Sequence, residues 1–305
     1  MSSPELVLGT RGSPLARWQT EQVLHALHLS RPGLKAEVKV IKTQGDQVLD
    51  LPLAQIGDKG LFTKELETAL LSGEIDLAVH SLKDLPTTLP EGLALGAMLE
   101  RHAPQDVLVT RNGRSLDDLA RGACVGTGSL RRQTQLQRLR PDLCFKDLRG
   151  NIQTRLHKLE RGDFDAIIMA RAALERLGLD ERIATIFPAS LMLPAVGQGA
   201  IAVEIRADDQ RTRELLTDVH HLPTALCCTA ERAFLKRLGG GCEKPIAAHA
   251  LLHDELIELY GFVASIDGVQ QLHAHLTGPV EAPEALGVAL AEQMLEQGAR
   301  TILGL

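Results

Sequence analysis

The chain has 305 residues and a hydrophobic content of 44%, which is enough for large cores and predicts two or three domains. Its net charge of -6 and aromatic content of 3% argue against a general nucleic-acid surface and against stacking platforms for single strands. Residues 1–18 carry charges throughout and lack the apolar run of a signal peptide, so we expect a cytosolic protein without membrane attachment.

The first half alternates short apolar runs with helical patterns, which predicts a largely parallel sheet covered by helices. The strands are expected at 6–10, 36–43 and 75–80, and the helices near 14–28 and 62–72. The segment 43–60 has glycines near both ends and weak periodicity, which fits either a mobile lid or a plain connecting loop.

The pattern restarts near Asp106. Strands are expected at 106–110, 123–127, 143–148 and 165–170, and helices near 129–140 and 151–161. "GTRGSPLARWQT" (9–20) matches "GTGSLRRQT" (126–134) when single residues are skipped, and "SGEIDLAV" (72–79) matches "RGDFDAII" (161–168). These echoes predict two α/β domains of similar topology that face each other across a ligand cleft.

The last third has a different character. A helix is expected at 224–238, three alternating strands at 245–252, 255–265 and 269–276, and a final amphipathic helix at 282–297. This pattern predicts a small α+β domain. A strand at 199–206 is expected to return the chain to the first domain, so the predicted domains are 1–99 with 200–217, then 100–199, then 218–305.

In both echoed segments a strand ends in Gly-Thr and a serine, Ser13 or Ser129, occupies an expected helix N-cap. Such junctions direct free backbone N–H groups toward anions. Arg131 and Arg132 fall in the first turn of the second helix, where the macrodipole disfavours cations, so we expect a compensating anion. The alternative is that both arginines are solvated at the surface.

Further arginines follow predicted strands, and each alone fits an ordinary surface residue. They are Arg11, Arg149, Arg155, Arg171 and Arg176. Together, on an acidic chain, they favour a substrate with several carboxylates, which the guanidinium fork binds well. Lys83 and Asp84 follow the strand at 75–80, and Asp84 is a candidate for acid–base work or a turn residue.

The five cysteines are an odd number in a chain without secretory features, so we expect reduced thiols and no metal site. Cys242 follows the triple glycine Gly239–Gly241. The negative end of the preceding helix argues against an activated thiolate there. Cys242 is therefore either a small buried residue or an attachment point beside cleared backbone.

Four segments, "ERAFLKRLGGGCEKPIA", "VHSLKDLPT", "GTGSLRRQTQLQRLRPDL" and "LRGNIQTRL", closely resemble the porphobilinogen deaminase (hydroxymethylbilane synthase) family of tetrapyrrole and heme biosynthesis. The resemblance implies a monomeric, cytosolic transferase with two domains like periplasmic binding proteins and a small C-terminal domain. It also implies a covalent dipyrromethane cofactor on which four porphobilinogen molecules condense with loss of ammonia.

The resemblance also implies roles for individual residues. Asp84 is the expected catalytic carboxylate. The expected cofactor-binding residues are Cys242, as the covalent thioether, with Lys83, Asp84, Thr127, Ser129, Arg131 and Arg132. The expected substrate-binding residues are Arg11, Ser13, Lys59, Arg149, Arg155 and Arg176.

The sequence departs from the family pattern at Gly128, where serine is common, and at Glu243-Lys244, where an uncharged pair is usual. Both changes affect fine cofactor contacts only. Two other functions compete with the enzyme. One is a non-catalytic two-lobed binding protein for a small anion, and the other is a thiol hydrolase or transferase with Cys242 as nucleophile.

Overall fold

The structure is a computed structural model that describes residues 5–43, 45, 63–241 and 243–305. These residues form two compact units, which are described separately. The first contains the described residues up to 45 together with 63–102 and 200–225, and the second contains 103–199 and 226–305. The segment 43–60, predicted as a lid or a loop, lies almost wholly outside the described residues.

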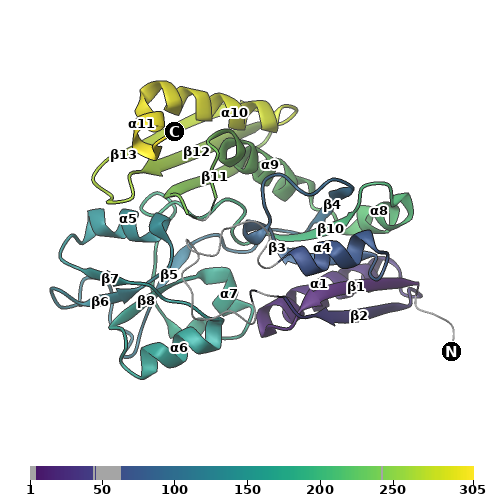
Figure 1. The fold of residues 1–305 in the computed structure, drawn as a ribbon, viewed down its shortest axis with the longest axis horizontal. Helices are drawn as coiled ribbons and strands as arrows, with labels where there is room; N and C mark the ends of the chain where they lie inside the picture. The colour runs from purple at the N-terminus through teal and green to yellow at the C-terminus, as the bar shows by residue number, and fades with distance from the viewer. Residues whose placement is uncertain (1–4, 44, 46–62, 242) are drawn as a thin grey trace. The chain divides into compact units, whose positions relative to one another are not determined.

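The first unit is built on a five-stranded sheet with the order β2-β1-β3-β10-β4 (Figure 1). The strands are β1 (Leu6–Arg11), β2 (Ala36–Ile41), β3 (Leu77–Ser81), β4 (Leu93–Met98) and β10 (Ile201–Arg206). β1 pairs in parallel with β2 and β3, whereas β10 runs antiparallel to β3 and β4. The strand expected at 199–206 therefore joins this sheet as β10. Because β10 runs antiparallel to its two neighbours, the sheet is mixed.

Helices cover both faces of this sheet. They are α1 (Pro14–Ser30), α4 (Lys64–Leu71) and α8 (Gln210–Leu216), with the short turns η1 (Leu82–Asp84) and η3 (Thr217–Val219). Val23 and Leu27 of α1 pack in one buried cluster with Leu216, and Leu66 and Leu70 of α4 pack in another. This burial on both faces holds the ends of β1 and β3 firmly.

The α/β part of the second unit repeats this arrangement with the strand order β7-β6-β8-β5-β9. The strands are β5 (Asp106–Thr110), β6 (Cys124–Gly126), β7 (Cys144–Lys146), β8 (Ala166–Ala170) and β9 (Ile183–Ile186). The helices are α5 (Leu130–Leu139), α6 (Ile152–Glu160) and α7 (Arg171–Glu175), with the short turn η2 (Asp180–Arg182). β5 is antiparallel to β8 and β9, so this sheet is mixed as well.

The two sequence echoes occupy equivalent places in the two sheets. The Val7 N–H donates to the Asp76 carboxylate at 2.8 Å, and the Cys124 N–H donates to the Asp165 carboxylate at 2.7 Å. Each aspartate precedes the third strand in the order and fixes the strand beside it. The predicted internal repeat is confirmed.

A three-stranded antiparallel sheet with the order β11-β12-β13 completes the second unit. Its elements are β11 (Ile246–His253), β12 (Leu256–Ala264), β13 (Gln271–Pro279), α10 (Pro283–Met294) and α11 (Arg300–Leu303), together with α9 (Leu222–Arg237) from residue 226 on. Phe234 of α9 and Met294 of α10 share its buried core. The final helix is not continuous to 297 as expected, because a wider turn, η4 (Leu295–Ala299), follows α10 and places Gly298 at φ 107°.

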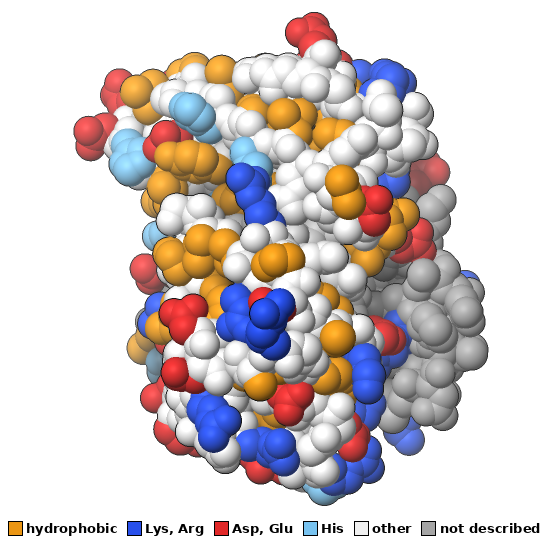
Figure 2. Space-filling view, turned by 90° about the vertical axis from the view of Figure 1, so that its left-hand side faces the viewer, with side chains coloured by type: hydrophobic (Ala, Val, Ile, Leu, Met, Phe, Trp, Pro, Cys, Tyr) orange, Lys and Arg blue, Asp and Glu red, His pale blue; other side chains and the backbone are white. Residues whose placement is uncertain are grey.

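The predicted fold class, two α/β domains and a small α+β domain with three antiparallel strands, is confirmed by these three sheets. The exact domain boundaries stay a prediction. In the part of the chain that the structure describes, no helix has the length and apolar character needed to cross a bilayer. Basic and acidic side chains are interspersed on the face shown in Figure 2.

Candidate functional site

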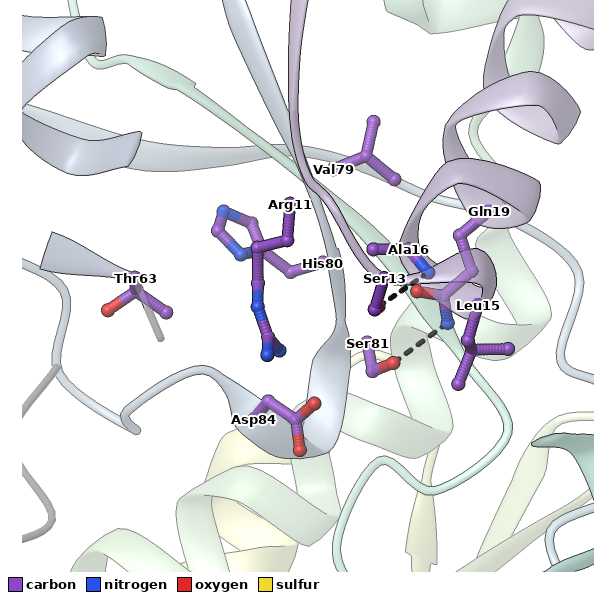
Figure 3. Close-up of a pocket in the computed structure, with 10 residues that line it drawn as sticks. All are labelled: Arg11, Ser13, Leu15, Ala16, Gln19, Thr63, Val79, His80, Ser81 and Asp84. Carbon is purple, nitrogen blue, oxygen red and sulfur yellow. Dashed lines mark hydrogen bonds between the residues drawn. The ribbon is translucent and has the colours of Figure 1, made fainter. Parts of the chain in front are cut away.

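A small pocket opens in the first unit where β1 and β3 end (Figure 3). Arg11 is the last residue of β1, and Asp84 is the last residue of the turn η1 that follows β3. In Figure 3 the Arg11 side chain extends toward Asp84. The pocket is lined by Arg11, Ser13, Leu15, Ala16, Gln19, Thr63, Val79, His80, Ser81 and Asp84. The structure thus brings together three of the predicted site residues: Arg11, Ser13 and Asp84.

Ser13 caps α1 as expected. Its Oγ accepts a hydrogen bond from the Ala16 N–H at 3.2 Å, and Pro14 occupies the first helical position. Nearby, the Gln19 Nε2 donates to Ser81 Oγ at 2.8 Å and joins the helix to the end of β3. The pocket wall is therefore held by bonds between elements.

Asp84 is exposed and Lys83 is half-buried, both on η1 at the carboxyl end of β3. The Leu85 N–H donates to the Leu82 carbonyl at 3.1 Å and closes this turn. This position agrees with the one expected from the sequence. An exposed carboxylate at a pocket rim is accessible to a ligand, as acid–base or charge-stabilising work requires.

His80 forms a buried pair beneath this pocket that sequence reasoning missed. Its Nε2 lies 3.1 Å from Glu204 Oε2, with side-chain exposures of 3% and 0%. Burial raises the pKa of the neighbouring Glu67 carboxyl, and Glu204 adds to that effect. The signal in the sequence was an acid, Glu204, inside an otherwise apolar strand.

Arg131 and Arg132, in the first turn of α5, are both buried and share one carboxylate. Arg131 Nη1 lies 2.6 Å from Asp106 Oδ2, and Arg132 Nη2 lies 2.8 Å from Asp106 Oδ1. The compensating anion expected at this helix is thus supplied by Asp106 of the chain itself. The alternative that these arginines are solvated at the surface is wrong, because both side chains are buried and bonded to Asp106 of β5.

The Asp106 carboxylate stays ionised despite complete burial. Burial opposes its ionisation, but the two guanidinium groups outweigh this effect and hold the pKa well below its usual range. Gln198 Nε2 also donates to Oδ1 at 2.9 Å. Two guanidinium charges against one carboxylate leave one net positive charge in this cluster. The sequence did not predict Asp106 or Gln198 as site residues, because neither lies in an echoed segment.

Thr127 and Ser129 form the loop between β6 and α5. The Ser129 N–H donates to Thr127 Oγ1 at 3.2 Å, and Thr127 is buried. Ser129 occupies the expected N-cap position, but within the described residues its side chain makes no capping hydrogen bond. The two echoed junctions therefore share backbone geometry and differ in the hydrogen bonding of the serine.

The remaining predicted arginines lie in the second unit. Arg149 Nε is 3.4 Å from Asp147 Oδ2, and Arg155 Nε donates to the Gly150 carbonyl at 2.7 Å. Arg176 is buried and donates to the Gly199 carbonyl at 2.7 Å. Burial lowers the pKa of Arg176 to about 10, so this side chain is still a cation at neutral pH.

Lys59 and Cys242 lie outside the described residues. The helix end before Cys242 explains two of the three glycines. Gly239 has φ 60°, a left-handed conformation that favours glycine, and a Cβ on Gly240 would lie 2.4 Å from Leu235 Cδ1. Among the described residues no group of three or more potential metal ligands occurs.

The fold defines an α/β protein with two five-stranded sheets of the same order, and Ser13, Arg11, Ser129 and Arg131 lie at or just after strand ends. The comparisons identify the family. The model described as "Porphobilinogen deaminase, dipyromethane cofactor binding domain" matches residues 6–214, and the one described as "Porphobilinogen deaminase, C-terminal domain" matches residues 225–296.

Curated relatives agree with these matches. The porphobilinogen deaminase of Moorella thermoacetica is 52% identical over 299 residues, with 98% of this chain and 96% of that protein covered. That of Syntrophotalea carbinolica is 50% identical over 303 residues, with 99% and 96% covered. The chain belongs to the porphobilinogen deaminase family, and this does not favour the non-catalytic alternative.

Among solved structures, an amino-acid transporter extracellular-binding protein, ytmK of Bacillus subtilis, aligns with a TM-score of 0.44 and 14% identity. The alignment covers 70% of this chain and 90% of that one. The BvgS periplasmic VFT2 domain of Bordetella pertussis has a TM-score of 0.42 and 19% identity, with 70% and 86% covered. The fold assignment rests on the strand orders given above.

The described residues fit the cofactor that the family description names. A dipyrromethane made from porphobilinogen carries acetate and propionate groups, so it needs several cationic donors. The buried cluster of Arg131, Arg132 and Asp106 has a net positive charge, and Arg131 lies two residues after Ser129. Guanidinium groups and a helix N-terminus are the donor set that carboxylates require.

Proposed function

We propose that the chain catalyses the reaction for which its family is named, as a transferase of tetrapyrrole and heme biosynthesis. Four porphobilinogen molecules are joined head to tail with loss of ammonia, and hydroxymethylbilane is released by hydrolysis. This is the hydroxymethylbilane synthase reaction. The proposal is supported by the 52% sequence identity to a curated relative over 98% of the chain, and by the pocket that contains Asp84.

Asp84 is the group assigned to the chemistry. Loss of ammonia leaves the substrate as an electron-poor azafulvene, and positive charge develops on the pyrrole nitrogen as the new bond forms. An exposed carboxylate at the pocket rim stabilises that charge and accepts or returns a proton. The buried His80–Glu204 pair supports the strand that ends beside Asp84.

Arg11 is assigned to a substrate carboxylate because its guanidinium lies in the same pocket as Asp84. Ser13, at the N-cap of α1, lines the same pocket and is also assigned to the substrate. Arg149, Arg155 and Arg176 are assigned to further substrate carboxylates, and so is Lys59, which lies outside the described residues. A chain that grows by one acetate and one propionate per ring requires this many cations.

Thr127, Ser129, Arg131 and Arg132 would hold the dipyrromethane, together with Lys83 and with Cys242 as the thioether attachment. When bound, this group supplies the electron-rich pyrrole ring to which the first substrate unit is joined. The residues themselves act by position and charge. The carboxylate of Asp106 holds both guanidinium groups in place through hydrogen bonds.

The pocket that combines Asp84 with Arg11 carries the proposal. We expect Asp84→Asn to keep the covalent adduct and to bind porphobilinogen, but to lower kcat by about a hundredfold or more. The matched control is Asp208→Asn, which removes the same charge from an exposed position. Single-turnover measurement of ammonia release checks this, and wild-type turnover in Asp84→Asn would remove Asp84 from the mechanism.

The monomeric state and the cytosolic location stay predictions from the sequence. Light scattering of the purified protein across a range of concentrations tests the first. A molar mass that stays at one chain supports it, and a mass that rises with concentration contradicts it.

A further inference from the structure

Two thiols lie side by side on neighbouring strands away from the groups assigned to the reaction. Cys124 is the first residue of β6 and Cys144 is the first residue of β7, and the parallel register pairs them directly. In a sheet, directly paired residues point their side chains to the same face. The two sulfur atoms are therefore on one side of the sheet.

The spacing of the two residues suits a covalent bridge. Neighbouring strands lie about 4.7–4.9 Å apart, which falls within the range of about 4.4–6.8 Å between the Cα atoms of disulfide-bonded cysteines. Each strand has only three residues, and β7 is the edge of its sheet. Because the pair lies at the beginning of both strands, a small adjustment of β7 brings the sulfur atoms together.

The surroundings give the two thiols different accessibility. Cys144 is exposed and Cys124 is half-buried. The backbone of Cys124 is fixed from both sides, since its N–H donates to the Asp165 carboxylate at 2.7 Å and its carbonyl accepts from the Asp165 N–H at 2.8 Å. An oxidant therefore reaches Cys144 first, and Cys124 is held in place as its neighbour.

The electrostatics agree with this order. Burial raises the pKa of the Cys124 thiol, Lys146 partly opposes that effect, and Asp165 and Cys144 add to it. Because its pKa is raised, Cys124 is mainly a protonated thiol at neutral pH. The other two described cysteines, Cys227 and Cys228, are buried.

We propose that Cys124 and Cys144 form a dithiol site that closes into an intramolecular disulfide by exchange with a small-molecule disulfide. The Cys144 thiolate attacks one sulfur of the small disulfide, and one small thiol leaves. The Cys124 thiolate then attacks the Cys144 sulfur of the mixed disulfide, and the second small thiol leaves. Two protein thiols are oxidised, one disulfide is reduced to two thiols, and the two cysteine protons pass to the leaving thiolates.

The bridge would join β6 and β7 at their first residues. Thr127 follows the other end of β6, and Arg149 lies beyond the other end of β7. It closes a loop of about twenty residues, which restricts the unfolded chain and raises the midpoint of thermal unfolding. The site does not depend on the proposed reaction, since neither thiol lies among the groups assigned to it. Its test can therefore fail while the proposed function stands.

Oxidised glutathione is the probe. The folded protein is incubated with it, free thiols are alkylated, and a tryptic digest is analysed without reduction. We expect one linked species that joins peptide 122–131 to peptide 139–146. In Cys124→Ser the reaction should stop at a stable glutathione adduct on Cys144, and in Cys144→Ser the linked species should be absent and Cys124 should react more slowly.

Three outcomes would overturn the proposal. One is wild-type protein that accumulates the glutathione adduct on Cys144 without the linked peptide. Another is a link that joins two copies of the chain, seen as a doubled mass on a denaturing gel without reductant. The third is a glutathione adduct on Cys144 that reaches the same level in the wild type and in Cys124→Ser. Circular dichroism of both serine variants checks that their fold is unchanged.

Discussion

Asp106 is the residue on which the predicted arginine cluster most depends. Its carboxylate accepts hydrogen bonds from both Arg131 and Arg132, and all three side chains are buried. A buried ion pair of this kind gives little net stability as a whole, but removing one partner leaves an uncompensated charge. Asp106 therefore positions the two arginines.

We expect Asp106→Asn to lower the free energy of unfolding by about 3–5 kcal/mol, because two buried guanidinium groups lose their counter-charge. Urea unfolding followed by circular dichroism measures this. Asp163→Asn is the matched control, since Asp163 pairs with Arg161 at the surface and its loss should matter little. Equal losses in both variants would contradict this role for Asp106.

The low pKa of Asp106 also predicts a pH dependence. Its folded pKa lies below the unfolded value of about 4, so its contribution to stability is complete above that value and is lost as the pH falls further. We expect the urea midpoint of the wild type to fall below pH 4 more steeply than that of Asp106→Asn. Parallel curves for the two proteins would show that Asp106 titrates normally.

At the scale of elements, α10 lies close against the backbone of α9 at Gly287. A Cβ at this position would lie 2.2 Å from the Ala230 carbonyl oxygen and 2.8 Å from the Phe234 backbone nitrogen. These are backbone atoms of α9 and have no rotamer by which to move away. The absence of a side chain at Gly287 therefore fixes the distance of α10 from the helix that precedes Gly239–Gly241.

Gly287→Ala would stabilise an isolated helix by about 1 kcal/mol, but here we expect a net loss of about 1–3 kcal/mol from overpacking. Thermal unfolding shows whether Gly287→Ala is less or more stable than the wild type. The control is Gly33→Ala, where nothing lies within 4 Å of the added Cβ, and we expect no loss there. A Gly287→Ala variant more stable than the wild type would mean that α9 and α10 separate easily.

Sequence patterns predicted elements well wherever a strand and its helix lay close together in the chain. The echoes identified β1 with β6 and β3 with β8, and each aspartate proved to bind the strand beside it. The strand β4 was missed because Gly96 interrupts "LALGAM", and β9 was missed because "IATI" has only four residues. The antiparallel direction of β10 depends on distant pairing that periodicity does not contain.

At the scale of the whole molecule, the sequence predicted Asp84 and Arg11 at one cleft because both follow predicted strands, and the structure places both in one pocket. It could not predict Asp106 or the His80–Glu204 pair, since their partners meet only when strands far apart in the chain become adjacent. The same strand order in two sheets gives each unit its own arginine at a comparable junction. An enzyme that binds a polycarboxylate requires such repeated cationic junctions.

We propose that Cys242 carries a primer made of two pyrrole rings. The most direct test is the mass of the intact, denatured protein, measured together with its activity. We predict that the active wild type is heavier than its sequence by a dipyrromethane, and that Cys242→Ser has the unmodified mass and no activity. A fully active wild type with the unmodified mass would show that no dipyrromethane is attached to Cys242.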